Sequence, residues 1–349
     1  MIPILYESTE TDFDSNGLGR LRDCISCTVT EERNGIYECD FEYPVGGHNY
    51  DRIRLGRIIA VEHDDTNDVQ PFDIVSYSRP INGIVTFHAV HISYRQSKMV
   101  ASGTNINSLS DAFSMLGNAT PTNPFIYVTD QNQTGYMASA DGTPRTVRQF
   151  LGGVEGSILD TYRGEYEWDK FRVVFHQNRG VERDFTIRYG VDLTAYDEDA
   201  DYTESYSAVV PYWKGSDALV TGNKVTATGT TYNGREECIP LDLSDKFEEQ
   251  PTAADLESYA QSYLASSNSM LPKQSIKVDF VRLSDSVEYR NLTPLYTFRL
   301  CDTVRVVFPR YNMDGRFKIV KTVYDVLLER FSEMELGSLS TTLAEALGI

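Results

Sequence analysis

Two glutamates, Glu165 and Glu167, have the residue type and the spacing that acid–base chemistry could use. Residues two apart on a strand share one face of the sheet, and paired carboxylates of this kind carry out glycoside hydrolysis. Asp160 and Asp169 lie close by in the sequence. Carboxylates at the edges of loops are also ordinary surface residues. We therefore predict no catalytic role for this group and keep cell-wall hydrolysis as an alternative.

Cys24 and Cys27 form a lone CxxC pair. A structural zinc site needs four ligands, and the sequence offers no second pair at a similar spacing. A redox pair should open a helix, whereas this pair lies among residues typical of strands, where a spacing of three places side chains on opposite faces. We interpret both as packing residues. Cys39, Cys238 and Cys301 are scattered, so no disulfide framework is expected.

The five histidines do not form the HExxH pattern of a helical zinc peptidase. His88 and His91 are three apart on an expected strand, so we interpret them as surface or interface residues. Gly156-Ser157 lacks the Gly-x-Ser-x-Gly pattern of a serine nucleophile. The glycine-rich segment 152–156 lacks the Lys and Ser or Thr of a phosphate loop. It is more typical of a tight turn.

Asp197, Asp199 and Asp201 have the alternating spacing that opens a calcium loop. The next position should be glycine and is Tyr202, and the late bidentate glutamate is replaced by Ala208. This pattern indicates an exposed acidic loop. The sequence therefore predicts no catalytic, cofactor-binding or metal-binding residue, no cofactor, and a protein that is not an enzyme.

The composition is that of a globular protein rich in strands. The 349 residues are enough for two or three domains, and the 22 Tyr and 16 Phe favour strands. The net charge of −19, with no run of basic residues longer than two, argues against tight binding to nucleic acid or anionic membranes. No stretch is long enough for a transmembrane helix, and residues 1–6 are too short for a signal peptide. We expect synthesis in the cytoplasm.

Helical patterns are few and short. Residues 109–116 have helical apolar spacing, with Ser108 as the expected N-cap. A second helix is expected to start at Thr143-Pro144, a third at a near capping box around Thr252, and a short last one after Ser340. The remaining apolar runs are separated by turn signals and predict strands.

A faint internal repeat gives the domain organisation. Leu55–Val61 resembles Leu300–Val306, and in each half a similar apolar segment follows, at Phe72–Val75 and Phe317–Val320. The repeat predicts a β-rich α+β fold with two related antiparallel β-barrel domains and an inserted α/β domain. The predicted domains are a first β-barrel over 1–98, an α/β domain over 99–205, a second β-barrel over 206–245 and 273–340, a helical insertion over 246–272, and a C-terminal tail over 341–349.

Short segments in the same order along nearly the whole chain resemble one family. The segments are 152–160, 164–169, 171–173, 178–180, 187–190, 211–212, 324–327, 329–330 and 335–337. Together they resemble the prophage tail family, also called tail-associated lysins or endopeptidase tails. The resemblance implies a fold like the central baseplate hub of contractile phages, in which three subunits form a ring with pseudo-sixfold symmetry.

The same resemblance implies a structural role at the tail tip of a phage or prophage virion. The homotrimer would close the tail tube and contact the distal tail protein and the tape-measure protein, with fibre or receptor-binding proteins as further partners. DNA would pass through the ring without specific binding, and no membrane insertion is expected. An acidic lumen would keep the DNA mobile.

Two departures from the family limit what the resemblance implies. Many relatives continue into peptidase, lysozyme or fibre-like domains, whereas this sequence ends at Ile349, so the hydrolase activity is not carried over. Cys301 stands where relatives tend to place glycine before Asp302, which predicts a differently built turn. The alternatives are a tail-associated cell-wall hydrolase and a receptor- or carbohydrate-binding module. Exposed aromatic clusters would favour the binding module, and Trp168 and Trp213 are the only tryptophans.

Overall fold

The computed structural model of the protein describes most of its chain. The described residues are 1–188, 193–216, 218–228, 234–247, 249–266, 269–270, 273–280, 297–311 and 313–337. The helix expected after Ser340 and the tail over 341–349 lie outside these residues.

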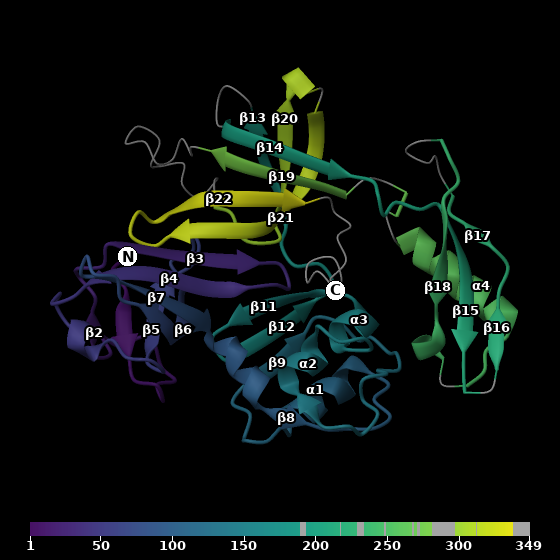
Figure 1. The fold of residues 1–349 in the computed structure, drawn as a ribbon, viewed down its shortest axis with the longest axis horizontal. Helices are drawn as coiled ribbons and strands as arrows, with labels where there is room; N and C mark the ends of the chain where they lie inside the picture. The colour runs from purple at the N-terminus through teal and green to yellow at the C-terminus, as the bar shows by residue number, and fades with distance from the viewer. Residues whose placement is uncertain are drawn as a thin grey trace.

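The first β unit is an antiparallel sheet on the left of Figure 1. On β3 (Ser26–Glu32) and β4 (Tyr37–Pro44), every second side chain is buried, as expected when one face of a strand meets the core. Asn34 and Gly35 make the turn between them, and Asn34 has a left-handed backbone with φ of 58°, which suits a tight hairpin. The other strands are β1 (Ile4–Tyr6), β2 (Gly19–Arg20), β5 (Ile58–Glu62), β6 (Val69–Ser78) and β7 (Ile84–His91).

An α/β unit follows, with a three-stranded sheet and three short helices at the bottom of Figure 1. Its central strand β12 pairs antiparallel with β11 and parallel with β9. Its core is continuous with that of the first β unit. The elements are η2 (Ile92–Lys98), β8 (Val100–Ala101), α1 (Leu109–Gly117), β9 (Ile126–Thr129), β10 (Arg145–Thr146), α2 (Val147–Leu151), α3 (Ile158–Tyr162), β11 (Glu165–Asp169) and β12 (Arg172–His176).

The helix predictions hold for α1 and need one correction for α2. Ser108 caps α1 by accepting a hydrogen bond from the backbone N–H of Asp111, as predicted. The second helix does not start at Thr143-Pro144. Thr146 instead forms a capping box with Gln149, and α2 begins at Val147, three residues after Pro144. The capping box satisfies two backbone N–H donors at the start of the helix, which the side chain of Pro144 cannot do.

The second β unit is drawn at the top of Figure 1. It consists of β13 (Glu182–Arg188), β14 (Leu193–Asp201), β19 (Lys273–Phe280), β20 (Thr303–Phe308), β21 (Met313–Asp325) and β22 (Arg330–Gly337). Asp197, Asp199 and Asp201 lie on β14 and not in the predicted acidic loop, because β14 pairs along its length with β19. A run of acids on alternating positions is compatible with a strand when those positions face solvent.

The segment between β14 and β19 forms a separate inserted unit, on the right of Figure 1. It contains β15 (Ala208–Lys214), β16 (Leu219–Thr221), β17 (Val225–Thr226), β18 (Cys238–Asp242) and α4 (Ala253–Ser266). Residues 206–245 were predicted to form one β-barrel with residues 273–340. The described strands of this segment instead pair with one another. The α4 residues Leu256, Ala260 and Leu264 cover their sheet.

The two β units share one open sheet. Its strand order is β14-β19-β22-β21-β3-β4-β7-β6-β5-β1-β2, with β20 pairing β21 and β13. Among the described strands the path does not return on itself, so the fold is β-rich but contains no closed barrel. The reason is that no other described strand lies beside the outer side of β14, at one end of the path, or beside the outer part of β6.

The internal repeat is present in the strand pairing. We call β3, β4, β5, β6 and β7 the first repeat, and β14, β19, β20, β21 and β22 the second. Neighbouring strands follow the order β3-β4-β7-β6-β5 in the first and β14-β19-β22-β21-β20 in the second. The chain visits equivalent strands in the same sequence order, which chance similarity of apolar patterns would not produce.

The register of pairing is also repeated. Ile58 pairs with Asp73 in the first repeat, and Thr303 pairs with Lys318 at the same offset in the second. Between β6 and β7 the ladder shifts between Ile74 and Ser76. Between β21 and β22 it shifts between Ile319 and Lys321, again at this offset. Bulges are specific features of a strand pair, so their coincidence supports duplication.

One turn has the same backbone hydrogen bond in both repeats. This corrects the prediction that the turn at Cys301 is built differently because it lacks glycine. Gly56 and Cys301 both have a left-handed backbone, with φ of 82° and 72°. The N–H of Gly56 donates to Ile74 O, and the N–H of Cys301 donates to Ile319 O, at 2.8 Å in both cases. The turn is therefore built in the same way without glycine, because these backbone hydrogen bonds hold the buried Cys301 in place.

Candidate functional site: a buried ionic junction

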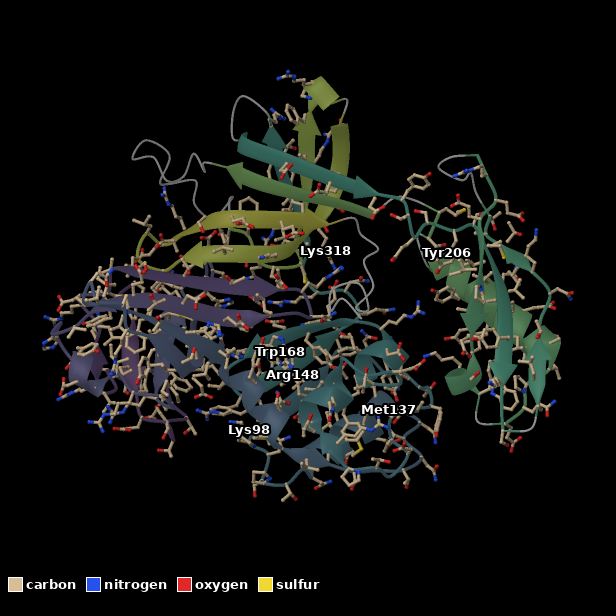
Figure 2. The ribbon with its side chains drawn as sticks, viewed as in Figure 1. Lys98, Met137, Arg148, Trp168, Tyr206 and Lys318 are labelled. Carbon is tan, nitrogen blue, oxygen red and sulfur yellow. The ribbon has the colours of Figure 1, made fainter. Side chains whose placement is uncertain are left out.

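The most strongly organised polar residues lie where the α/β unit meets both β units. Glu165 on β11 is buried, and both of its carboxylate oxygens accept hydrogen bonds from Lys318 Nζ of β21 at 2.7 Å. Arg33 Nη1 lies 3.3 Å from the same carboxylate, and the backbone N–H of Arg179 donates to it at 2.6 Å. Figure 2 shows Lys318 at this border. The charges are neutralised inside the protein, as buried charges require.

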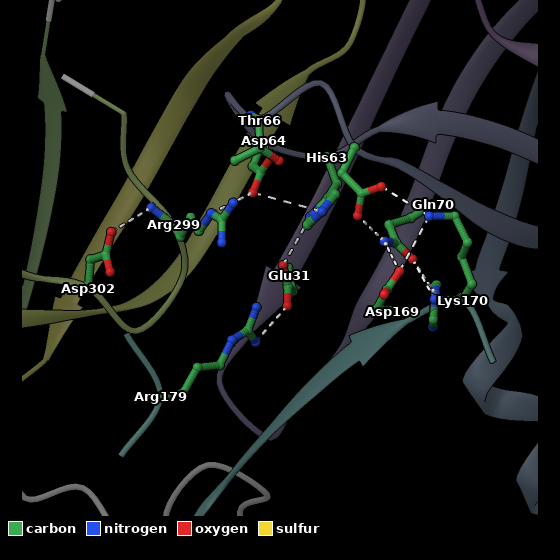
Figure 3. A network of polar contacts seen from close by, with 12 residues as sticks. Glu31, His63, Asp64, Thr66, Gln70, Asp169, Lys170, Arg179, Arg299 and Asp302 are labelled. Atoms are coloured by element: carbon green, nitrogen blue, oxygen red, sulfur yellow. Dashed lines mark hydrogen bonds and ion pairs between the residues drawn. The ribbon is translucent and has the colours of Figure 1, made fainter. Parts of the chain in front are cut away.

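A second buried carboxylate, Glu31 on β3, continues the junction (Figure 3). Arg179 Nη1 donates to Glu31 Oε1 at 2.9 Å, and His63 Nδ1 lies 3.3 Å from Oε2. Burial alone would raise the pKa of Glu31, but the charge of Arg179 and the adjacent imidazole of His63 outweigh it and lower that pKa to about 2. Glu31 therefore remains ionised in the folded protein at neutral pH.

His63 links this carboxylate to a third one. Its Nε2 lies 3.9 Å from Asp64 Oδ2, which in turn lies 3.9 Å from Arg299 Nε. Burial would lower the pKa of His63, but the adjacent carboxylates of Glu31 and Asp64 outweigh this and raise the pKa. The folded structure therefore favours the protonated imidazole.

The turn that holds Cys301 also belongs to the junction. Asp302 is almost fully buried, and its Oδ2 accepts hydrogen bonds from Arg183 Nε at 2.6 Å and from the backbone N–H of Arg299 at 3.0 Å. Its Oδ1 accepts from the backbone N–H of Val181 at 2.9 Å. Burial raises the pKa of the neighbouring Cys301 thiol to about 12, which keeps it neutral.

The two repeats meet directly beside this junction. Residues 321–325 of β21 pair antiparallel with residues 28–32 of β3. Tyr324 and Val326 are buried in the main core there, and Val326 N–H donates to Cys27 O. The ionic junction thus fixes the strand pair that joins the first repeat to the second, and its arrangement is structural.

The glutamates that could have done acid–base chemistry have other roles. The Glu165 carboxylate is saturated by Lys318, Arg33 and the backbone. Glu167 accepts a hydrogen bond from His176 Nε2 at 2.7 Å, and this bond lowers the pKa of Glu167. A hollow in the α/β unit is lined by a single carboxylate, Asp111, whose oxygen already accepts from the Ser108 hydroxyl. The described residues therefore place no carboxylate pair around an open site.

The cysteines and histidines divide between core and surface. Cys27 is buried on β3, 3.7 Å from Cys39 between the sulfur atoms, as expected of packing residues. Cys24 precedes β3, so the argument from opposite strand faces does not apply to it. His88 is partly exposed beside Asp40, but His91 is fully buried and stacks on Tyr37. Its assignment to the surface was wrong, because it ends β7 facing the core.

Sequence reasoning missed the residues of the junction. Glu31 gave a usable signal, since it follows Cys27 and Val29 at the buried parity of β3. Lys318 lies between Phe317 and Ile319 on a long strand and gave none. Neither residue suggests its partner, because these pairs are distant in sequence. Among the described residues no cluster of His, Cys, Asp and Glu could hold a metal ion, and no helix is long and apolar enough to cross a membrane.

Comparison with known proteins agrees with this fold. Residues 181–347 match the family model described as prophage endopeptidase tail, which confirms the family resemblance for the second half of the chain. Comparison with curated proteins gives no match.

Three solved structures have the same fold over nearly their whole length. A prophage tail protein from Listeria monocytogenes has a TM-score of 0.65 at 12% identity, with 100% of this chain and 98% of that chain covered. A tail protein from Neisseria meningitidis has a TM-score of 0.64 at 13% identity, with 97% and 96% covered. The 43 kDa tail protein of prophage MuSo2 from Shewanella oneidensis has a TM-score of 0.64 at 10% identity, with 97% and 98% covered.

Proposed function

We propose that the protein is a structural component of a phage or prophage tail, the baseplate hub at the tail tip, and not an enzyme. The observation that carries this proposal is the duplicated β unit. A chain with two equivalent units can form a ring of six such units from three copies, which suits the sixfold end of a tail tube. The family match over residues 181–347 and the shared fold of three prophage tail proteins support it.

The partners follow from this position. The trimeric ring would close the tail tube, contact the distal tail protein on one side and tip or fibre components on the other, and meet the tape-measure protein in its channel. The net charge of −19 would let DNA pass without binding. In this proposal the chain is located in the virion, at the tail tip.

Labelling of assembled particles tests the proposed location. Antibodies against the chain, applied to intact phage particles, are expected to bind at the end of the tail distal to the head. Particles from a strain that lacks the gene should have tails that are absent or open at the tip. Label along the tail shaft, or normal tails without the chain, would contradict the proposal.

Zymography on peptidoglycan tests the hydrolase alternative. No clearing is expected from the purified chain, because Glu165 is held in an ion pair and Glu167 binds His176. Clearing by the wild-type protein that is absent with a folded Glu167→Gln variant would overturn the non-enzymatic assignment. The carbohydrate-binding alternative gains no support from the two tryptophans, since Trp168 and Trp213 are both buried.

A further inference from the structure

Among the described strands, the two strands equivalent to the pair that joins the repeats, β6 and β14, each have an edge without a neighbour. In the junction, β21 of the second repeat uses one edge twice. Residues 313–318 pair with β20, and residues 321–325 pair with β3. On β6, the equivalent strand of the first repeat, residues 69–73 pair with β5. Among the described strands, none pairs with the outer residues 75–78 on that edge, and all four are exposed.

The equivalent of β3 also lies at an edge. The pairing registers make β14 the counterpart of β3, with Asp197 at the position of Thr28 and Asp199 at that of Thr30. Of the strands that the structure describes, β14 is the last in the sheet, with β19 as its neighbour on one side. Open edges of this kind present backbone groups that can pair with another chain. The molecule therefore presents an open edge equivalent to each of the two strands that pair in the junction: β6 is equivalent to β21, and β14 to β3.

Exposed apolar residues on the β6 edge have buried counterparts in the junction. Tyr77 is 44% exposed, whereas Thr322 at the equivalent position is 3% exposed. Ile81 in the β6–β7 turn is 107% exposed, whereas Val326 at the same offset is 0% exposed. Val45 lies beside this turn, since its N–H donates to Gly83 O, and it is exposed as well. The outer part of the first repeat therefore exposes an apolar surface of the kind that a binding partner covers.

The charges select one pairing of edges over the others. Asp197 and Asp199 are exposed on β14, so two β14 strands side by side would place like charges opposite each other. The open end of β6 carries Ser76 and Ser78 and is followed by Arg79, with no acid there. The acidic β14 edge and this end of the first repeat therefore carry opposite charges.

We propose that β14 of one copy pairs antiparallel with the outer part of β6 of the next copy, in the register that places Ser78 opposite Asp199. This inference rests on the proposed ring. The proposed β14–β6 pairing between two copies is equivalent to the β3–β21 pairing within each copy. An interface between two different patches generates a ring when its rotation closes. Pairing both edges in this way would extend the open sheet around the channel.

Disulfide trapping tests the register. Ser78→Cys and Asp199→Cys are combined in one chain in which the exposed Cys238 is replaced by serine. Directly opposed residues in antiparallel strands have Cβ atoms about 4.5–5.5 Å apart, close to the geometry of a disulfide. Mild oxidation is expected to link most chains into covalent trimers. Mixing the two single-cysteine variants should give covalent dimers only, which shows that the bond forms between copies.

Two control pairs calibrate the experiment. Thr30→Cys with Val323→Cys occupies the equivalent register within one chain and should form its disulfide without linking copies. Asp40→Cys with Asp199→Cys combines the β14 position with an exposed residue of β4 and should not cross-link. Ile81→Asp, at a fully exposed position, should leave the folded monomer unchanged but raise the concentration of half-assembly roughly tenfold or more.

The outcomes separate this inference from the ring itself. A trimeric mass without cross-linking of the Ser78–Asp199 pair, while the Thr30–Val323 pair forms, would overturn the pairing and leave the ring standing. Cross-linked copies in open chains of other sizes would support the pairing and contradict the trimer. A chain that stays monomeric at high micromolar concentration and is not cross-linked would contradict both.

Discussion

Glu165 and Lys318 are 153 positions apart in the chain, yet they form the central ion pair between the α/β unit and the second repeat. Both side chains are 8% exposed. Removing one partner from a buried pair leaves an uncompensated charge, which costs far more than losing an exposed pair. The pair thus stabilises the position of the α/β unit against the second repeat.

Replacing Lys318 should therefore be strongly destabilising. Lys318→Met is expected to lower the free energy of unfolding by about 3–5 kcal/mol, measured by denaturant unfolding. The matched control is Lys321→Met, three residues further along β21, whose partly exposed pair with Glu32 at 3.2 Å should contribute about 0–1 kcal/mol. Equal effects of the two variants would show that the buried pair has no special role.

His63 should make stability depend on pH. A base whose pKa is raised on folding contributes stability that is present below its unfolded pKa, here 6.5, and is lost as the pH rises through the raised value. The loss of unfolding free energy caused by His63→Gln should therefore be larger at about pH 6 than at about pH 9. The measurement is denaturant unfolding of both proteins at the two pH values. A difference that does not change with pH would contradict the assignment.

At the scale of the element, the turn that the two repeats share depends on a left-handed backbone at Gly56 and Cys301. A side chain added at Gly56 would meet no atom within 4 Å, so Gly56→Ala tests the backbone alone. It should cost about 1–2 kcal/mol. Gly117→Ala at the end of α1, also in open space but without a positive φ, should instead be neutral or stabilise by up to about 1 kcal/mol. Thermal and denaturant unfolding decide this, and a neutral Gly56→Ala would refute the role of the turn.

Elements with a clear period or cap could be predicted from the sequence, and the others could not. The spacing of Leu109, Ala112 and Leu116 with Ser108 before them gave α1 correctly. The acids of β14 were misread as a loop, because its strand character comes from pairing with β19, which is distant in sequence. The strand-rich character and the repeat were visible in the sequence, whereas the predicted closed barrels are not formed by the described strands. The junction was not visible in the sequence, since each of its pairs joins residues from different units.

At the scale of the whole molecule, the inserted unit replaces a tight turn. The first repeat connects β3 and β4 through residues 33–36, whereas the second connects β14 and β19 through residues 202–272. Two polar contacts connect side chains of the insert to the α/β unit. They are Lys246 with Asp160 at 3.0 Å and the Arg163 guanidinium over the Tyr263 ring. The insert is therefore an addition to a complete repeat.

Deleting the insert should leave the two repeats folded. Replacing residues 202–272 with the four residues 33–36 is expected to preserve a strand-rich circular dichroism spectrum and cooperative unfolding, because Asp201 and Lys273 are already paired across the sheet. The loss should be limited to the insert's own core. A chain that aggregates or unfolds without cooperativity would show that the insert is required by the second repeat.

The mass of the protein in solution tests the central claim most directly. At high micromolar concentration, light scattering should give three times 39.4 kDa, and electron microscopy of the same sample should show rings with a central hole. A mass of 39.4 kDa that persists when the distal tail protein is added would contradict the account, because the duplicated repeats would then have no ring to form.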